Sequence, residues 1–185
     1  MPEKYAIIYF TYRLIKTCRP WATECTPMLT AKGKYGLKAL IYLSSVLPGK
    51  TVQAVDIAEA SNIPKRFLDA ILRELRNAGI VCSKKGPGGG YVLARPPHDI
   101  QIGQVIRTLD GPLAPIACAS RTAFRQCDDC KDVRACAVRL AMTKVRNAEA
   151  EILDRMTIAD MLRDARQVQG RPPSRYLRKA AGAGR

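Results

Sequence analysis

The apolar and polar positions of residues 29–80 predict three helices in succession. The stretch "LTAKGKYGLKALIYLSSVLPG" is apolar often enough for a mostly buried helix, which Pro48 and Gly49 end. The stretch 51–80 then divides into two shorter helices around a turn at residues 62–64. We expect Val55, Ile57 and Ala58 to face the core from the first of these. The second carries one apolar stripe, formed by Phe67, Leu68, Ile71, Leu72 and Leu75.

A β-hairpin is predicted directly after these helices. The runs "IVCSKK" and "YVLAR" favour strands, and "GPGGG" between them makes a glycine-rich tip. Cys82, on the first strand, is expected to lie in the core. Three helices followed by a hairpin describe a winged helix-turn-helix. The predicted fold class is therefore mainly α with a small β-hairpin wing.

The remaining pattern predicts a short helix, a loop and a long helix. The short helix lies in "DIQIGQVIRTLDG" and ends at Gly111, and Pro112 and Pro115 then oppose regular structure in a cysteine-rich stretch. On the long helix, apolar residues recur at steps of 3, 4, 3 and 4: Val138, Ala141, Val145, Ala148 and Ile152. Such a heptad seam is typical of a dimerisation helix, although a helix that packs on its own domain has the same spacing. Thr157 is expected to cap a final short helix.

These elements divide the chain into four parts. Residues 1–27 form an N-terminal extension unlike the rest, with Met28 as an alternative start. Residues 28–97 form the DNA-binding domain, and residues 98–165 form a sensor loop and dimerisation helix. Residues 166–185 are basic and rich in Gly, Pro and Ala, which predicts a disordered tail.

The charge of the chain indicates a polyanionic partner. A formal net charge of +15 and a pI of about 9.8 attract nucleic acid first and anionic membranes second. The apolar run "YAIIYFTYRLI" is too short to span a membrane and is a poor signal peptide. We therefore predict a cytoplasmic protein that binds double-stranded DNA and does not bind a membrane.

Candidate DNA contacts lie on the third helix and in the wing. A helix-turn-helix presents polar side chains of its second helix to the bases, which here are Lys65, Arg66, Asp69 and Arg73. Glycines of the tip such as Gly88 let the backbone approach DNA, and Lys84 and Lys85 place cations beside it. The alternative for each cation is a solvated surface charge. The tip lacks the ending of a P-loop, so no nucleotide site is predicted.

Several segments in this order resemble the Rrf2 family of bacterial transcriptional regulators: "LTAKGKYGLKAL", "IAEASNIPKRFLDAILRELRNAGIV", "KKGPGGGYVLAR", "IGQVI" and the clustered cysteines. The family includes the iron-sulfur regulator IscR, the nitric-oxide sensor NsrR and the iron regulator RirA. The resemblance runs from about Met28 to Leu162. It implies a homodimer that binds a pseudo-palindromic operator, with a long helix that crosses over its partner subunit.

The resemblance also implies particular DNA contacts. Lys32, Tyr35, Arg66, Phe67 and Asp69 fall at positions where family members touch DNA. Lys85 falls where a wing arginine often enters the minor groove, and it keeps the charge without the fork geometry of arginine. Asp69 replaces a glutamate that governs site selectivity in IscR-like proteins, which leaves the class of operator open.

Four of the seven cysteines gather between the short and the long helix, at spacings x8, x2 and x5: Cys118, Cys127, Cys130 and Cys136. Thiolates bind iron-sulfur clusters and zinc. In a reducing cytoplasm, clustered cysteines more often hold metal or sense oxidants than form structural disulfides. These four residues are therefore the candidate metal ligands.

The resemblance implies an iron-sulfur cluster here, although two ligand positions of the family differ. Arg139 stands where IscR-like proteins have a histidine, and Lys34 stands where NsrR-like proteins have an aspartate. The added CxxC motif supplies a fourth cysteine instead. The simplest interpretation is an all-cysteine site for a 2Fe-2S or 4Fe-4S cluster, and zinc or a metal-free thiol switch are the alternatives.

The predicted function is a transcriptional regulator, most simply a repressor, whose operator binding is gated by the cluster in response to iron, nitric oxide or redox state. An enzyme is the competing class. A thiol oxidoreductase would place its CxxC in a thioredoxin-like βαβ pattern, which is not found around Cys127 and Cys130. A nuclease would need clustered carboxylates or histidines, and His98 is the only histidine. We therefore predict that the protein is not an enzyme.

Overall fold

The computed structural model describes residues 29–47, 49–130 and 132–169. The predicted N-terminal extension lies outside these residues, as does the predicted tail from residue 170 onward. Helix α7 continues to Gln169, so residues 166–169, which the sequence assigned to the tail, are helical. The Gly- and Pro-rich composition that predicted the tail begins only after this helical turn.

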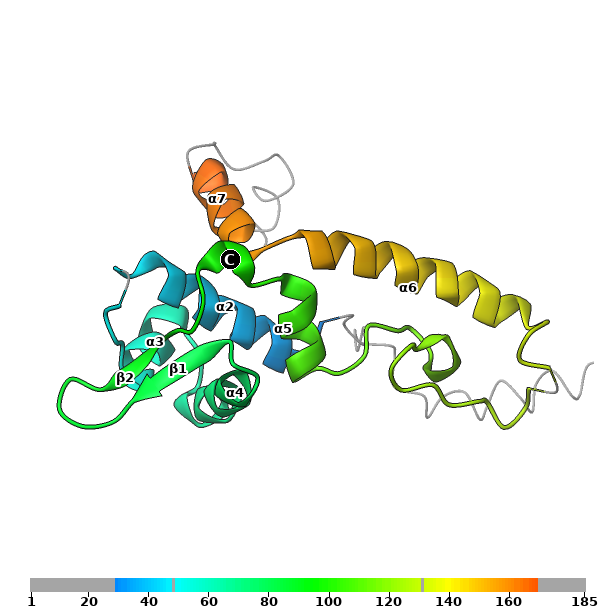
Figure 1. Ribbon diagram of the computed structural model, residues 1–185, viewed down its shortest axis with the longest axis horizontal. Helices are drawn as coiled ribbons and strands as arrows, with labels where there is room; N and C mark the ends of the chain where they lie inside the picture. The colour runs from blue at the N-terminus through cyan, green and yellow to red at the C-terminus, as the bar shows by residue number, and fades with distance from the viewer. Residues whose placement is uncertain (1–28, 48, 131, 170–185) are drawn as a thin grey trace, which may run out of the picture.

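The described chain forms a winged helix-turn-helix followed by a long projecting helix, which confirms the predicted fold class (Figure 1). The first half contains α2 (Ala31–Ser45), α3 (Ala54–Ser61), α4 (Lys65–Asn77), β1 (Val81–Lys84) and β2 (Gly90–Leu93). The second half contains the short helix η2 (Pro97–Asp99), α5 (Ile102–Leu109), η3 (Ala117–Ala119), α6 (Ala137–Arg155) and α7 (Ile158–Gln169).

One hydrophobic core holds the winged helix together. Helix α2 runs through it and contacts α3, α4, α5, α7 and β2. The inner face of α4 is fully buried, through Leu68, Ile71, Leu72 and Leu75. Burying an aliphatic side chain of this size stabilises a fold by about 1.5–3 kcal/mol, so these four residues fix the orientation of α4.

Three predicted core residues are in fact exposed. Phe67 was placed in the apolar stripe of α4, but 49% of its surface is accessible, because it lies at the outer edge of that stripe. Val55 is 39% exposed on the first turn of α3. Cys82 was expected in the core, yet it is exposed on β1, because the burial of Val81 sends the next side chain to the opposite face of the hairpin.

The wing is an antiparallel hairpin to which a third short segment is attached. Cys82 pairs with Val92 in the register of the two strands. Val52, just before α3, exchanges two backbone hydrogen bonds with Tyr91, at 2.9 and 2.7 Å between N and O. Gly90 adopts a φ of 152° where it passes the backbone of Val52, and a Cβ at this position would collide with the Val52 carbonyl. The wing is thus anchored to the start of α3.

The core continues across the predicted domain boundary at residues 97 and 98. Ile100, Val105 and Leu109 are buried in the same cluster as α2 and α4. Ile158, at the start of α7, is also buried there, and its N–H donates to the Ile100 carbonyl at 3.0 Å. Division of the chain at this point remains a prediction, while α5 and the start of α7 pack as parts of the winged-helix core.

Helix α6 projects from this core (Figure 1), and it carries the apolar seam that the sequence predicted. All five seam positions are exposed, including Val138 at 63% and Ile152 at 60%. The opposite face packs against α5 and η3. Among the described residues, the seam is therefore left largely uncovered.

No helix among the described residues combines the length and the apolar character that a membrane crossing requires.

Candidate nucleic-acid interface and cysteine loop

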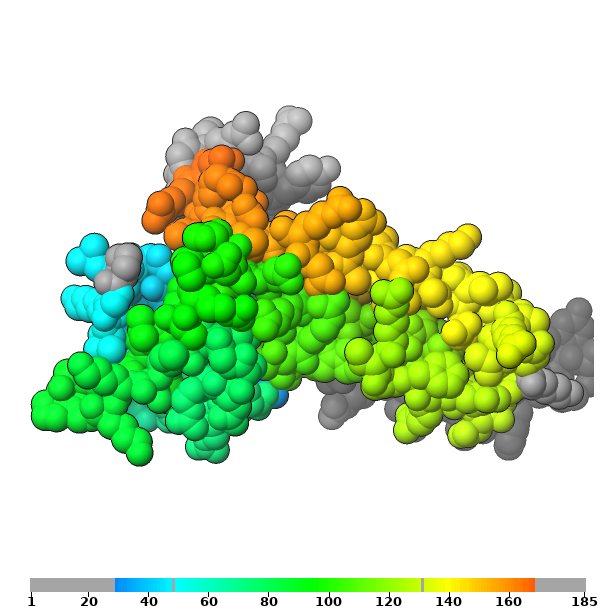
Figure 2. All heavy atoms as spheres, in the orientation of Figure 1, coloured from blue at the N-terminus to red at the C-terminus, as the bar shows by residue number. Residues whose placement is uncertain are grey.

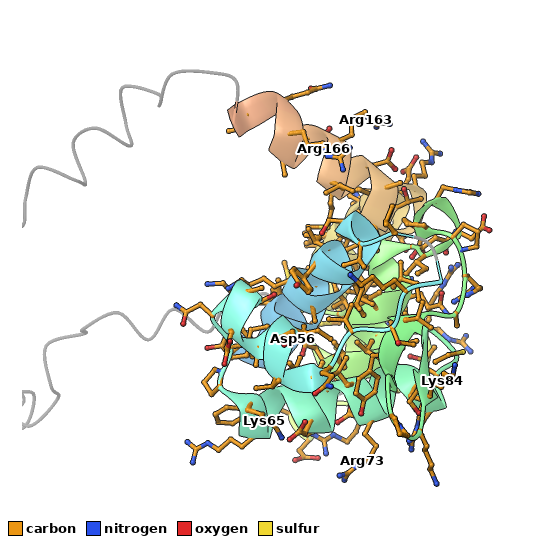
Figure 3. All side chains as sticks on the ribbon, turned by 90° about the vertical axis from the view of Figure 1, so that its left-hand side faces the viewer. Asp56, Lys65, Arg73, Lys84, Arg163 and Arg166 are labelled. Atoms are coloured by element: carbon orange, nitrogen blue, oxygen red, sulfur yellow. The ribbon has the colours of Figure 1, made fainter. Side chains whose placement is uncertain are left out.

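Charged side chains of α4 and the wing lie along one edge of the molecule. Figure 3 shows Lys65 and Arg73 of α4 and Lys84 of β1 along the lower edge, with Arg163 and Arg166 of α7 at the far end. Arg73, Lys84 and Lys85 are all exposed. The structure therefore brings the predicted contacts of the recognition helix and the wing onto a common edge.

Two of the lysines predicted to contact DNA form ion pairs with carboxylates of α4. Lys65 forms an ion pair with Asp69 at 2.9 Å, one helical turn away. Lys32 of α2 forms an ion pair with Glu74 of α4 at 2.7 Å. Both pairs are partly exposed, and such pairs contribute at most about 1 kcal/mol. Phosphate groups can therefore compete for these two lysines.

Two further predicted contacts lie at the start of α4. The guanidinium of Arg66 lies over the ring of Phe67, 4.9 Å from its centroid. This cation–π contact places the arginine against the exposed ring. Tyr35 of α2 is half-buried and packs against the core.

The tip of the wing is held by hydrogen bonds. Thr51 donates its hydroxyl to the carbonyl of Gly88 at 2.7 Å, and the N–H of Gly89 donates to the carbonyl of Gly86 at 2.8 Å. Gly86 and Gly88 have φ values of 93° and 73°, which side-chain-bearing residues rarely adopt. The glycines thus give the tip its shape, and Thr51 ties it to the segment before α3.

The cysteine loop, residues 112–136, lies beneath α6 at the opposite end from the wing (Figure 2). Cys118 is buried in η3, Cys130 and Cys136 are half-buried, and Cys127 is exposed. The sulfur of Cys136 accepts the N–H of Arg139 at 3.5 Å and so caps α6. The loop therefore begins and ends on residues attached to helices, with an exposed middle.

The thiols of the loop affect one another's ionisation. The pKa of the Cys127 thiol is raised, first by a hydrogen bond with Cys118, then by desolvation and by the nearby charges of Cys118, Asp129 and Cys130. The pKa of the Cys130 thiol is raised first by desolvation and then by a hydrogen bond with Cys136 and by nearby charges that include Cys118. The four thiols thus share one electrostatic environment.

The four thiols have the donor chemistry that an iron-sulfur cluster or zinc requires. In the part of the chain that the structure describes, however, no group of three or more His, Cys, Asp or Glu side chains is close enough to hold a metal ion. The thiols would have to move closer together for all four to act as ligands. The exposed middle of the loop is the part whose movement would meet the least packing resistance.

Arg139 connects the two ends of the cysteine loop. Its Nε donates to the carbonyl of Cys118 at 2.9 Å, and its guanidinium lies 5.9 Å from the ring centroid of Phe124. Its own N–H contacts the sulfur of Cys136. The sequence singled out Arg139 only because it cannot serve as a metal ligand, whereas the structure assigns it a positioning role.

A series of polar contacts leads from this loop to the recognition helix. Arg107 of α5 makes two hydrogen bonds to Asp154 of α6, at 2.6 and 2.9 Å, which lower the pKa of that carboxyl. Asp110, at the end of α5, accepts hydrogen bonds from the start of α2: from the Thr30 N–H at 3.0 Å, the Thr30 hydroxyl at 2.5 Å and the Gly33 N–H at 3.1 Å. The ion pair between Lys32 and Glu74 then joins α2 to α4.

Sequence reasoning missed these connecting residues. Arg107, Asp110 and Asp154 are separated from their partners by 47 to 80 positions, so no local spacing points to them. The sequence offers one signal, because Asp110 is a carboxylate directly after a helix. This position does not show which other helix Asp110 contacts.

Known protein families and solved structures include relatives of this chain. Residues 29–164 match the Rrf2 family, described as iron-dependent transcriptional regulators. The chain belongs to the Rrf2 family. It is therefore a DNA-binding helix-turn-helix transcriptional regulator and not an enzyme, which confirms the resemblance seen in the sequence.

Its relatives within the Rrf2 family carry different names. A protein of Rhodobacter capsulatus, named as an rrf2-like helix-turn-helix transcriptional regulator, is 41% identical over 81% of this chain and 99% of its own. The structure of T. potens IscR matches with a TM-score of 0.61 and 31% identity, over 80% of this chain and 95% of its own. CymR of B. subtilis, described as the global cysteine regulator, matches with a TM-score of 0.59 and 32% identity, over 72% and 95%.

Proposed function

We propose that this Rrf2 regulator binds an operator as a homodimer and that an iron-sulfur cluster on Cys118, Cys127, Cys130 and Cys136 gates the binding. Repression is the direction that we expect. When bound, such a cluster makes the loop sensitive to iron, nitric oxide or redox state. The description of the family as iron-dependent and the similarity to IscR support the cluster. The exposed apolar seam of α6 supports the homodimer.

The observation that carries the proposal is the attachment of the cysteine loop to α6. Arg139 holds the carbonyl of Cys118 at 2.9 Å, so a change at the buried end of the loop acts directly on this helix. The contacts from Asp154 through Arg107 and Asp110 then lead to α2 and α4. A change in the loop can thereby alter the spacing of two recognition helices, which must fit half-sites about one helical turn apart.

A metal-free thiol switch is the second candidate. The mutual effect of the loop thiols on their pKa values favours it, because two neighbouring thiols can release two electrons and two protons to an oxidant such as a disulfide and become a disulfide themselves. The similarity to CymR, described as a cysteine regulator, also supports this candidate. Zinc on the same four thiolates is the remaining alternative.

Anaerobic purification of the full chain separates the three candidates. Iron, sulfide and zinc are measured per chain, and absorbance is recorded between about 300 and 450 nm, where thiolate-ligated clusters absorb. We expect iron and sulfide in stoichiometric amounts, and their loss in Cys118→Ala and Cys130→Ala. Cys82→Ala is the matched control, because Cys82 is a cysteine outside the loop. Stoichiometric zinc in a colourless protein would contradict the cluster, and a metal-free protein with reversible disulfides would establish the thiol switch.

Binding to DNA is tested on the cluster-loaded and cluster-free forms of the same preparation. The operator is first selected from random double-stranded sequences, and footprints of the two forms are then compared. We expect a clear difference in affinity that Cys130→Ala abolishes. Equal affinity of the two forms would show that the loop does not gate the operator.

The edge formed by α4 and the wing is tested separately. Arg73→Gln and Lys84→Gln should each weaken DNA binding and reduce the slope of log affinity against log salt by about 1. Arg163→Gln removes the same charge at the far end of the molecule and should leave that slope unchanged (Figure 3). An equal effect of all three substitutions would show that the overall charge of the protein, and not this edge, determines DNA binding.

A further inference from the structure

A small cavity lies where the winged-helix core, the cysteine loop and α6 meet. Its volume is about 190 Å³. Arg107 and Leu113 line it from the side of α5, Ser120 and Thr122 from the loop, and Arg146 and Asp154 from α6. Because a water molecule occupies about 30 Å³ in the liquid, the cavity has room for a molecule of several non-hydrogen atoms.

Arg146 makes this cavity unusual. Only 8% of its surface is exposed, and it is the one buried charged residue in the part of the chain that the structure describes. Its Nε is buried without a hydrogen-bond partner, and none of the ion pairs among the described residues includes it. A buried guanidinium is costly unless an anion compensates its charge. The structure thus holds a cation at the wall of a cavity without a partner for it.

The other charged groups of the cavity leave this cation uncompensated. Asp154 supplies the only carboxylate among the described residues that line it, and both oxygens of Asp154 are engaged by Arg107. Arg121 adds a second positive charge from the loop. The hydroxyl of Thr122 offers a hydrogen-bond donor beside these arginines. The cavity therefore presents a net positive wall with donors, which is the complement of an oxyanion.

We propose that this cavity is a binding site for a small organic or inorganic oxyanion, a carboxylate or a phosphate, held by Arg146 with Arg121. A planar guanidinium binds two oxygens of such a group side by side, which a lysine cannot do. The ligand would contact α5, the segment just after Cys118 and α6 at once. The proposal does not rest on the cluster, because the cavity contains none of the four cysteines.

Calorimetric titration of the reduced full chain tests the proposal. The probes are inorganic phosphate, acetate and succinate, each at the same ionic strength set with chloride. We expect at least one probe to bind saturably with one site per chain. Whichever of the three binds identifies the group as phosphate, monocarboxylate or dicarboxylate.

Substitutions then assign the site to its arginines. Arg146→Met should weaken binding by about tenfold or more, and Arg146→Lys should restore it only in part, because lysine keeps the charge but loses the fork. Arg121→Met, at an exposed position that does not endanger folding, should also weaken binding. Arg155→Met removes the same charge from an exposed position of the same helix and should leave the affinity unchanged.

Two results would overturn the proposal. The first is that none of the probes binds to the native chain. In that case, a shift from dimer to monomer in Arg146→Met would assign Arg146 to a carboxylate of a partner subunit. The second is equal affinity in Arg121→Met, Arg146→Met and Arg155→Met.

Discussion

The winged helix and the cysteine loop are stabilised in different ways. The winged helix buries a continuous cluster that includes Leu40, Leu72 and Val105, with none of their surface exposed. Of the described residues of the cysteine loop, only Leu113, Cys118 and Ala119 are buried, and all of residues 121–129 are exposed. The first region is therefore determined by packing, whereas the second is held at its two ends by a few polar contacts. Binding of a ligand can rearrange the cysteine loop at a low cost in free energy, because few buried contacts have to break.

The largest expected effect comes from a core substitution in the winged helix. Leu72→Ala should lower the free energy of unfolding by about 2–5 kcal/mol, because it leaves a cavity in a close-packed core. Phe124→Ala deletes a larger side chain from the cysteine loop, where it is half exposed, and should cost less than about 1 kcal/mol. Urea denaturation of the metal-free protein measures both. Equal costs would remove the distinction between the two regions.

A smaller effect is expected at the junction between α5 and α2. Asp110→Ala deletes the acceptor of three hydrogen bonds at the start of α2 and should cost about 1–2 kcal/mol. Asp132→Ala, in the loop, removes a carboxylate that accepts one N–H, from Arg134 at 2.8 Å, and should change the stability by less than about 0.5 kcal/mol. Thermal unfolding compares the two, and a larger loss in Asp132→Ala would reverse the ranking.

The contact between α5 and α6 predicts a pH dependence. The hydrogen bonds from Arg107 hold the pKa of Asp154 below its usual range, so the stabilisation is present above the unfolded carboxyl pKa of about 3.9 and is lost as the pH falls through the lowered value. Because both groups are partly exposed, Asp154→Asn should cost no more than about 1 kcal/mol at pH 7. The loss of stability caused by Asp154→Asn should become smaller below about pH 4. A loss that becomes larger there would contradict the assignment of this contact to an ionised Asp154.

The smallest effect is expected in the exposed part of the loop. Cys127→Ser in the metal-free, reduced protein should change the free energy of unfolding by less than about 0.5 kcal/mol, because this thiol packs against little. Cys118→Ser places a hydroxyl in a buried position and should cost more. Urea denaturation under reducing conditions distinguishes them. A larger loss in Cys127→Ser would mean that the middle of the loop is packed.

Much of this molecule could be predicted from local pattern. The helices, the hairpin and its glycine tip follow from periods and breakers within a few residues, and Thr157 caps α7 as expected, since its hydroxyl accepts the Asp160 N–H at 3.2 Å. The errors fall at the edges of such patterns. Phe67 and Val55 have apolar side chains at positions where a helix turns from the core to solvent, and Cys82 follows a buried residue on a two-faced strand.

The candidate site was predicted in its composition but not in its connections. The sequence by itself determined the winged helix-turn-helix, the basic edge and the four loop cysteines, because each depends on residues that are neighbours along the chain. Only the tertiary structure decided that Arg139, Asp154, Arg107 and Asp110 connect the loop to α2. It also decided that Arg146 is buried at a cavity wall. Contacts across 21 to 80 positions depend on how the helices pack, and no local period encodes that packing.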